Sequence, residues 1–304
     1  MPPTERWIDL ADPDTAALRA AIQVHLHPTD EARLQAPARH DDEPRPRLAA
    51  HGNYVFGVLV LPTIDPNGDV TRHEIDVVAT LDRLVTVRKT PPGQSPADLS
   101  ELVNTARRDD LAPGMSLYML VDEIAEQFLT VVDDFDSDID ELEDNVGAWT
   151  SQAVRERIST IRHEILLVRR VLTPSRDAAR AVLDDRVELD GEISLFPREI
   201  ELHFADAYDK LLRATDSLDL ARDLLAGVRD FHQAQVANDQ NEVMKRLTVI
   251  ASVLLLPTFI VGLYGQNLHG SPELNWTHGY WFSWGLIVVT TIAQLVYFRR
   301  KRWI

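Results

Sequence analysis

Residues 230–267, DFHQAQVANDQNEVMKRLTVIASVLLLPTFIVGLYGQN, decide the fold of this chain. The 18 residues from Leu247 to Tyr264 carry no charge. A helix rises about 1.5 Å per residue, so this run is just long enough to cross a hydrocarbon core about 30 Å thick. The stretch therefore predicts a transmembrane helix that continues directly from a polar helix.

A second pattern in this stretch is a set of residues spaced alternately four and three apart, which share one helix face. We call it the small-residue stripe, and its members are Asp230, Ala234, Ala237, Asn241, Met244, Thr248, Ala251, Leu255, Thr258 and Gly262. Small and hydroxylated side chains on a membrane helix indicate either close helix packing or the wall of a water-filled path. The stripe alone favours close packing.

A second uncharged run covers residues 280–298 and is followed by Arg299, Arg300, Lys301 and Arg302. Basic residues prefer the cytoplasmic side of a membrane, so the C-terminus is expected inside. Two spans then return the N-terminus to the cytoplasm as well, and MPPTERWIDLADPD has no apolar signal-peptide core. We expect a multi-pass protein of the cell membrane with both termini cytoplasmic.

The N-terminal residues 1–114 predict a cytoplasmic α/β domain. Strands are expected where β-branched and apolar residues gather, at residues 7–10, 53–62, 73–81 and 83–90, with a hairpin turn at Asn67-Gly68. Helices are expected to begin near Ala16 and after Asp30.

Residues 115–196 predict an antiparallel helical hairpin, with helices at 115–146 and 151–185 and the second interrupted or bent at Pro174. Residues 122–144 hold eleven acidic side chains and no Lys or Arg. Such a run indicates a solvated face, or a negative surface that concentrates divalent cations.

The remaining segments are expected to form a stalk and a membrane part. Residues 197–264 predict one stalk helix that becomes the first span at about residue 247. An outer loop (265–279), the second span (280–298) and a basic cytoplasmic tail (299–304) follow.

Composition and motifs argue against other classes of protein. The net charge of -17 argues against nucleic-acid binding, and the absence of cysteine excludes thiolate chemistry and disulfides. The sequence contains no nucleotide-binding glycine motif and no hydrolase motif, so we expect no enzyme.

The architecture as a whole resembles the CorA family of divalent-cation channels. The resemblance is most specific in NEVMKRLTVIAS (241–252), TFIVGLYGQN (258–267), ProGluLeu (272–274) and the closing RKRWI (300–304). It implies a homopentamer whose first membrane helices line one central pore. The resemblance thus changes the interpretation of the small-residue stripe from packing to pore wall.

The resemblance also assigns roles to residues. It implies an outer selectivity loop with Gly265, Gln266, Asn267 and Glu273, and a cytoplasmic constriction at Asn241, Met244 and Leu247. The implied pore-lining residues are Asp230, Asn241, Met244, Leu247, Thr248, Ala251, Leu255, Thr258 and Gly262. The implied function is passive, potential-driven influx of Mg²⁺, and also Co²⁺ and Ni²⁺, with no cofactor and with Mg²⁺ as substrate and candidate regulator.

One departure from the family pattern concerns selectivity. Gly265-Gln266-Asn267 stands where the family usually has Gly-Met-Asn. A zinc transporter of the ZntB-like branch, with His269, His278 or Glu273 as ligands, is therefore an alternative. A membrane-anchored sensor that no longer conducts is a second one.

Another departure concerns regulation. By resemblance Asp206 is the stalk partner of a regulatory cation, whose other acid follows a His-Pro pair, here His27-Pro28. That position is Arg33. Either Arg33 supplies a permanent positive charge toward Asp206, or Asp30 or Glu31 takes over as the ligand.

Overall fold

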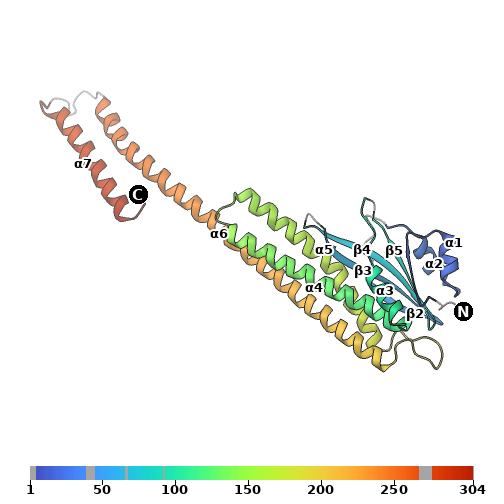
Figure 1. Cartoon of the computed structure of the whole chain (residues 1–304). Coiled ribbons are helices and arrows are strands. Elements are labelled where there is room, and N and C mark those ends of the chain that lie inside the picture. Colours follow the sequence, from blue (N-terminus) through green and yellow to red (C-terminus); the bar gives the residue numbers. More distant parts are fainter. Residues whose placement is uncertain (1–4, 39–44, 66–67, 92, 267–275, 304) are drawn as a thin grey trace. The chain divides into compact units, whose positions relative to one another are not determined.

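The computed structural model describes residues 5–38, 45–65, 68–91, 93–266 and 276–303 (Figure 1). Its elements are β1 (Trp7–Ala11), α1 (Thr15–Ala21), α2 (Pro28–Gln35), β2 (Arg47–His51), β3 (Tyr54–Ile64), β4 (Val70–Ala79), β5 (Leu84–Lys89), α3 (Ser100–Arg108), α4 (Pro113–Asn145), α5 (Ser151–Leu183), α6 (Arg198–Gly265) and α7 (Gly279–Arg300). The chain divides into two compact units, an N-terminal unit, Met1–Val228, and a C-terminal unit, Arg229–Ile304.

A five-stranded mixed sheet, in the order β1-β5-β4-β3-β2, lies at the centre of the N-terminal unit. β1 and β5 are parallel, and the other neighbouring strands are antiparallel. The four predicted strands are all present. Strand β2, with the sequence RLAAH, was not predicted because alanine and charged residues have low β propensity. It is held by its register with β3, in which Arg47 pairs with Val58.

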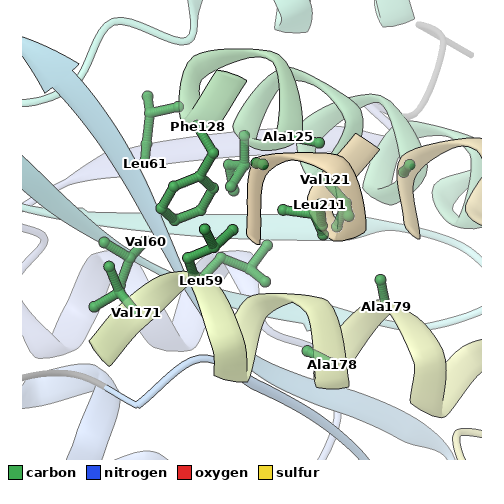
Figure 2. Close-up of a cluster of buried hydrophobic side chains, with 14 of the residues drawn as sticks. Leu59, Val60, Leu61, Val121, Ala125, Phe128, Val171, Ala178, Ala179 and Leu211 are labelled. Atoms are coloured by element: carbon green, nitrogen blue, oxygen red, sulfur yellow. The ribbon is translucent and has the colours of Figure 1, made fainter. Parts of the chain in front are cut away.

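The two faces of the sheet have separate cores, because successive side chains of a strand point to opposite sides. On one face Tyr54, Phe56 and Val58 of β3 pack with buried leucines of α1 and α2. On the other face β3 packs against the long helices α4 and α5, and α6 contributes to the same buried cluster. Figure 2 shows this contact through Leu59, Phe128 and Val171. The two helices predicted as a hairpin therefore share one core with the sheet.

Helix α5 is continuous for 33 residues, so the interruption considered at Pro174 does not occur. Proline lacks the N–H that would bond to the carbonyl four residues earlier. The next residue, Ser175, uses its hydroxyl to donate to the Val171 carbonyl at 2.8 Å. Packing in the core outweighs the single lost backbone hydrogen bond.

Helix α6 is a single helix of 68 residues, as the sequence predicts. Within the N-terminal unit it buries residues spaced three and four apart, with alanine at nearly every second place. These are Ile200, Phe204, Ala207, Leu211, Ala214, Leu218, Ala221, Leu225 and Val228. Small alanine side chains let neighbouring helices approach closely, and the leucines fill the spaces between them.

Candidate ion pathway and regulatory residues

Two helices of the described residues are long and apolar enough to cross a membrane: α6 in its C-terminal part, and α7. Length and hydropathy alone would also fit a core helix of a soluble protein. However, in the apolar 18-residue stretch of each helix, only 11% is buried in α6 and only 6% in α7. Apolar residues left this exposed require a nonaqueous environment or other chains to cover them.

One side of α6 in the C-terminal unit packs against α7. Val249 and Ile260 of α6 are buried, and so is Phe298 of α7. The two helices are also joined by a hydrogen bond, in which the Gln294 side-chain amide donates to the Ser252 carbonyl at 3.3 Å. Gln294 was not among the predicted contact residues, although a glutamine inside an apolar span is itself a signal of a polar contact.

The small-residue stripe lies on a different side of α6. All ten of its members are exposed in the single chain, whereas the residues that face α7 are buried or half-buried and none of them belongs to the stripe. The stripe is therefore free to face other copies of the chain or water. Its small and hydroxylated side chains differ from the exposed aliphatic neighbours Ile250, Leu254 and Leu263.

The two threonines of the stripe bond to their own helix. Thr248 Oγ1 donates to the Met244 carbonyl at 2.8 Å, and Thr258 Oγ1 donates to the Leu254 carbonyl at 2.7 Å. The donated proton is thus used inside the helix, while each hydroxyl oxygen keeps lone pairs that can accept from water. Such oxygens can receive hydrogen bonds from the water shell of a hydrated cation.

The expected cytoplasmic constriction consists of exposed, uncharged side chains. Met244 and Leu247 are each 57% exposed, and Asn241 is also exposed. The nearby Arg246 is paired with Glu242 at 3.5 Å. Apolar side chains that converge in an assembly would form a narrow, poorly wetted ring. Asp230, the first member of the stripe, pairs with Arg229 at 3.0 Å.

The expected selectivity loop is only partly described. Helix α6 ends at Gly265, and the Gln266 backbone N–H donates to the Leu263 carbonyl at 3.4 Å. Asn267 and Glu273 lie outside the described residues, as does His269. Among the described residues no three histidine, aspartate or glutamate side chains lie close enough together to hold a metal ion.

The acids that follow His27-Pro28 have different environments. The Asp30 side chain is buried, and its Oδ2 accepts from the Tyr54 hydroxyl at 2.8 Å. Glu31 is half-exposed on α2, where its Oε1 lies 3.8 Å from Arg19. Of these two acids, only Glu31 therefore presents a carboxylate that a cation from solution can reach.

Arg33 and Asp206 are not paired within the chain. The Arg33 guanidinium donates to Glu74 Oε1 of β4 at 2.9 Å. Asp206 is exposed on α6. Arg33 therefore has a carboxylate partner inside the chain, and its pairing with Asp206 of a neighbouring subunit stays a prediction.

Comparison with known proteins identifies the family. A model described as CorA-like Mg²⁺ transporter protein matches residues 4–300. The cobalt/magnesium transport protein CorA of Thermotoga maritima is 27% identical over 267 residues, 86% of this chain and 73% of that protein. The complete structure of the CorA magnesium transporter from Methanocaldococcus jannaschii has a TM-score of 0.80 at 22% identity, covering 98% of this chain and 91% of that chain.

A more distant structural neighbour is a cytoplasmic domain. The ZntB cytoplasmic domain from Vibrio parahaemolyticus has a TM-score of 0.51 at 16% identity, covering 76% of this chain and 88% of that chain, which shows a shared fold alone. The family model, in contrast, spans almost the whole chain, and the resemblance found in the sequence is confirmed. This chain belongs to the CorA-like Mg²⁺ transporter family, whose members are membrane transporters and not enzymes.

Proposed function

We propose that this chain forms a homopentameric channel for passive Mg²⁺ influx, with the small-residue stripe of α6 as the pore wall. The single observation that carries the proposal is the exposure of the whole stripe on a side of α6 that does not face α7. Family membership and the names of the relatives support Mg²⁺ and Co²⁺ as cargo.

The membrane potential is a sufficient driving force. One elementary charge gains about 2.3 kcal/mol across 100 mV, so a divalent ion gains about 4.6 kcal/mol. The proposed orientation has both termini in the cytoplasm, because basic residues occupy the last turn of α7 and the positions after it, and Lys245-Arg246 precede the apolar part of α6. Influx then needs no nucleotide site.

Uptake into proteoliposomes under an imposed inside-negative potential tests the proposal. We expect uptake of Mg²⁺, with Co²⁺ and Ni²⁺ also carried, and the detergent-solubilised complex should contain five copies of the 34.3 kDa chain. Transport of Zn²⁺ but not Mg²⁺ would identify the ZntB-like alternative. A correctly assembled pentamer that carries none of the four ions would identify the non-conducting sensor.

Variants of the loop sharpen this assay. Asn267→Ala should abolish uptake, because a side-chain amide that meets the water shell of the ion is lost. Gln266→Met should retain Mg²⁺ flux, since it restores the usual residue of the family, and its preference between Mg²⁺ and Zn²⁺ is to be compared with that of the unmodified protein. Equal loss of flux in both variants would contradict the proposed order of importance.

We also propose that cytoplasmic Mg²⁺ regulates the channel through Asp206 and Glu31 of neighbouring subunits. Both carboxylates are accessible, whereas Asp30 and Arg33 are engaged inside the chain. Glu31→Gln and Asp206→Asn should each weaken the inhibition of flux by internal Mg²⁺. Asp223→Asn, which changes an exposed carboxylate of α6 that is paired with Arg222 of the same helix, is the matched control. Unchanged inhibition in the first two variants would exclude these residues as ligands.

A further inference from the structure

A compact cluster of four charged side chains lies inside the N-terminal unit, away from the proposed pathway. We call it the buried charge cluster: Arg33 of α2, Glu74 and Asp76 of β4, and Lys89 of β5. Lys89 Nζ lies 2.9 Å from Glu74 Oε1 and 2.6 Å from Asp76 Oδ2. Glu74 Oε1 also accepts from the Arg33 guanidinium at 2.9 Å.

The cluster is closed to water except at Arg33. Asp76 is 0% exposed, Lys89 4% and Glu74 8%, whereas the Arg33 side chain is 30% exposed. Two positive and two negative groups make the cluster neutral when all are ionised. Among the described residues, however, Asp76 Oδ2 has only Lys89 as a partner, and no donor reaches Oδ1. An ionised carboxylate without a full set of donors is costly in such a place.

Helix α2 closes this cluster. Arg33 contributes its guanidinium to Glu74, and its backbone carbonyl accepts from Lys89 Nζ at 2.9 Å. At the other end of α2, Asp30 is bonded to Tyr54. Both ends of α2 are therefore attached to the sheet through charged groups, and movement of α2 would admit water to Asp76.

We propose that the buried charge cluster is a proton-responsive clamp on α2, in which uptake of a proton by Asp76 as the cytoplasm acidifies tightens the docking of α2 on the sheet. The helix carries Glu31, so the clamp would set the position of an accessible carboxylate. The inference concerns the docking of α2 and does not depend on transport.

The direction follows from the pKa of Asp76. Burial raises it from 3.8 to about 7; Glu74 raises it as well, while Lys89 and Arg33 lower it. These are the charged groups that act on Asp76 from β4, β5 and α2. When α2 leaves, water returns and the pKa falls toward 3.8, so the docked state binds the proton more tightly. This contribution to docking is fully present below pH 3.8 and is lost as the pH rises through about 7.

Hydrogen exchange of residues 28–35 in the full-length protein, measured between about pH 5 and 8 and corrected for intrinsic rates, tests the clamp. Protection of α2 should increase as the pH falls, approaching about tenfold per pH unit below 7 because one proton is bound on docking. Protection of core segments of α4 and α5 should not follow this curve. If those segments change in parallel with α2, the proton stabilises the whole unit and the clamp is excluded.

Three variants identify the titrating group. Asp76→Asn should make α2 protection independent of pH. Lys89→Gln removes a charge that lowers the pKa of Asp76, so the pH at which α2 protection begins to increase should move to a higher value. Loss of a merely structural contact would instead weaken protection at every pH. Asp9→Asn, which removes the 2.7 Å ion pair with Arg88 outside the cluster, is the control and should leave the midpoint unchanged.

Two histidines near α2 are the alternative source of a pH dependence in α2 protection. His51 Nε2 lies 3.7 Å from Asp30 Oδ2, and the His51 and His27 rings are stacked at 6.3 Å. A pH dependence that persists in Asp76→Asn would belong to these histidines and would overturn the proposal. Should Asp76→Asn fail to fold, the shift of onset in Lys89→Gln and the comparison of α2 with α4 in the unmodified protein decide the question.

Discussion

At the scale of single residues, two glycines of the N-terminal unit have opposite surroundings. A Cβ on Gly114, in the first turn of α4, would lie 2.1 Å from the Leu195 carbonyl oxygen, which is backbone and cannot rotate away. A Cβ on Gly227 of α6 would meet nothing within 4 Å among the described residues. Position 114 therefore requires glycine, whereas position 227 has room for a larger side chain.

Substitution by alanine should separate these two glycines. Gly114→Ala should lower the free energy of unfolding by about 1–3 kcal/mol, as overpacking does. Gly227→Ala should raise it by about 0.5–1 kcal/mol, because alanine loses less backbone entropy in a helix. Thermal unfolding of the purified full-length protein measures both. A Gly114→Ala variant as stable as the unmodified protein would show that the loop around Leu195 can move.

The proposed constriction allows another prediction at this scale. Met244→Asp would place a charged, hydrated side chain in a ring of apolar ones, so water should fill the constriction and resting Mg²⁺ flux should rise several-fold. Met244→Leu keeps an apolar side chain of similar size and should leave flux nearly unchanged. Reduced or unchanged flux in a correctly assembled Met244→Asp channel would place the gate elsewhere.

The sequence could predict which residues carry charge but not which of them meet. Arg33 and Glu74 are 41 residues apart and come together only because α2 packs across the sheet. The interpretation of Arg33 as a partner for Asp206 rested on motif position, and the nearer carboxylate of the same chain could not be seen in it. The periodicity of the stripe predicted that its members share one helix face, but the stripe alone favoured close packing, whereas the structure leaves this face exposed in the single chain.

At the scale of elements, the contact between α6 and α7 depends on one polar side chain as well as on packing. Gln294→Leu removes the hydrogen bond to the Ser252 carbonyl and should weaken helix association by about 0.6 kcal/mol, and by no more than about 1.7 kcal/mol. Thr290→Val is a suitable control, since that hydroxyl donates to carbonyls of its own helix. Thermal stability of the pentamer in detergent should fall in the first variant and not in the second.

Strongly patterned elements were predictable, and weakly patterned ones were not. The runs of apolar and β-branched residues in β3 and β4 and the unbroken helical pattern of α6 identified them from the sequence. Strand β2 was missed because RLAAH has low β propensity, and helix α3 was missed because SELVNTARR, although it contains good helix formers, is only nine residues long and has no side-chain N-cap. Each is fixed by its neighbours: β2 by pairing with β3, and α3 by burial of Val103 and Ala106.

At the scale of the whole molecule, charge is distributed unevenly. Of the eleven acids in residues 122–144, Asp122 and Glu126 pair with Lys210 at 2.7 and 2.6 Å, and Asp138 pairs with Arg157. Burial raises the pKa of Asp136, and so do the neighbouring carboxylates Asp133 and Asp140. This part of α4 therefore carries a negative potential that attracts cations without a defined site.

Such diffuse attraction should depend strongly on ionic strength. Raising monovalent salt from about 0.01 M to about 0.15 M shortens the screening length from about 30 Å to about 8 Å, so weak Mg²⁺ binding to the protein should fall. Equilibrium dialysis measures the bound Mg²⁺. A variant with Asp140→Asn, Glu141→Gln and Asp144→Asn should show lower binding and a smaller salt effect. Binding that does not change with salt would indicate a specific site instead.

The alternating alanine and leucine contacts of α6 also determine how this helix can move. They repeat every 3.5 residues, whereas a straight helix has 3.6 residues per turn and drifts by about 20° per heptad. Keeping Phe204 through Val228 in the core therefore requires a left-handed winding of α6 around its partners. On such a path, sliding and turning are not independent. An axial displacement of this segment must be accompanied by rotation, as in a screw.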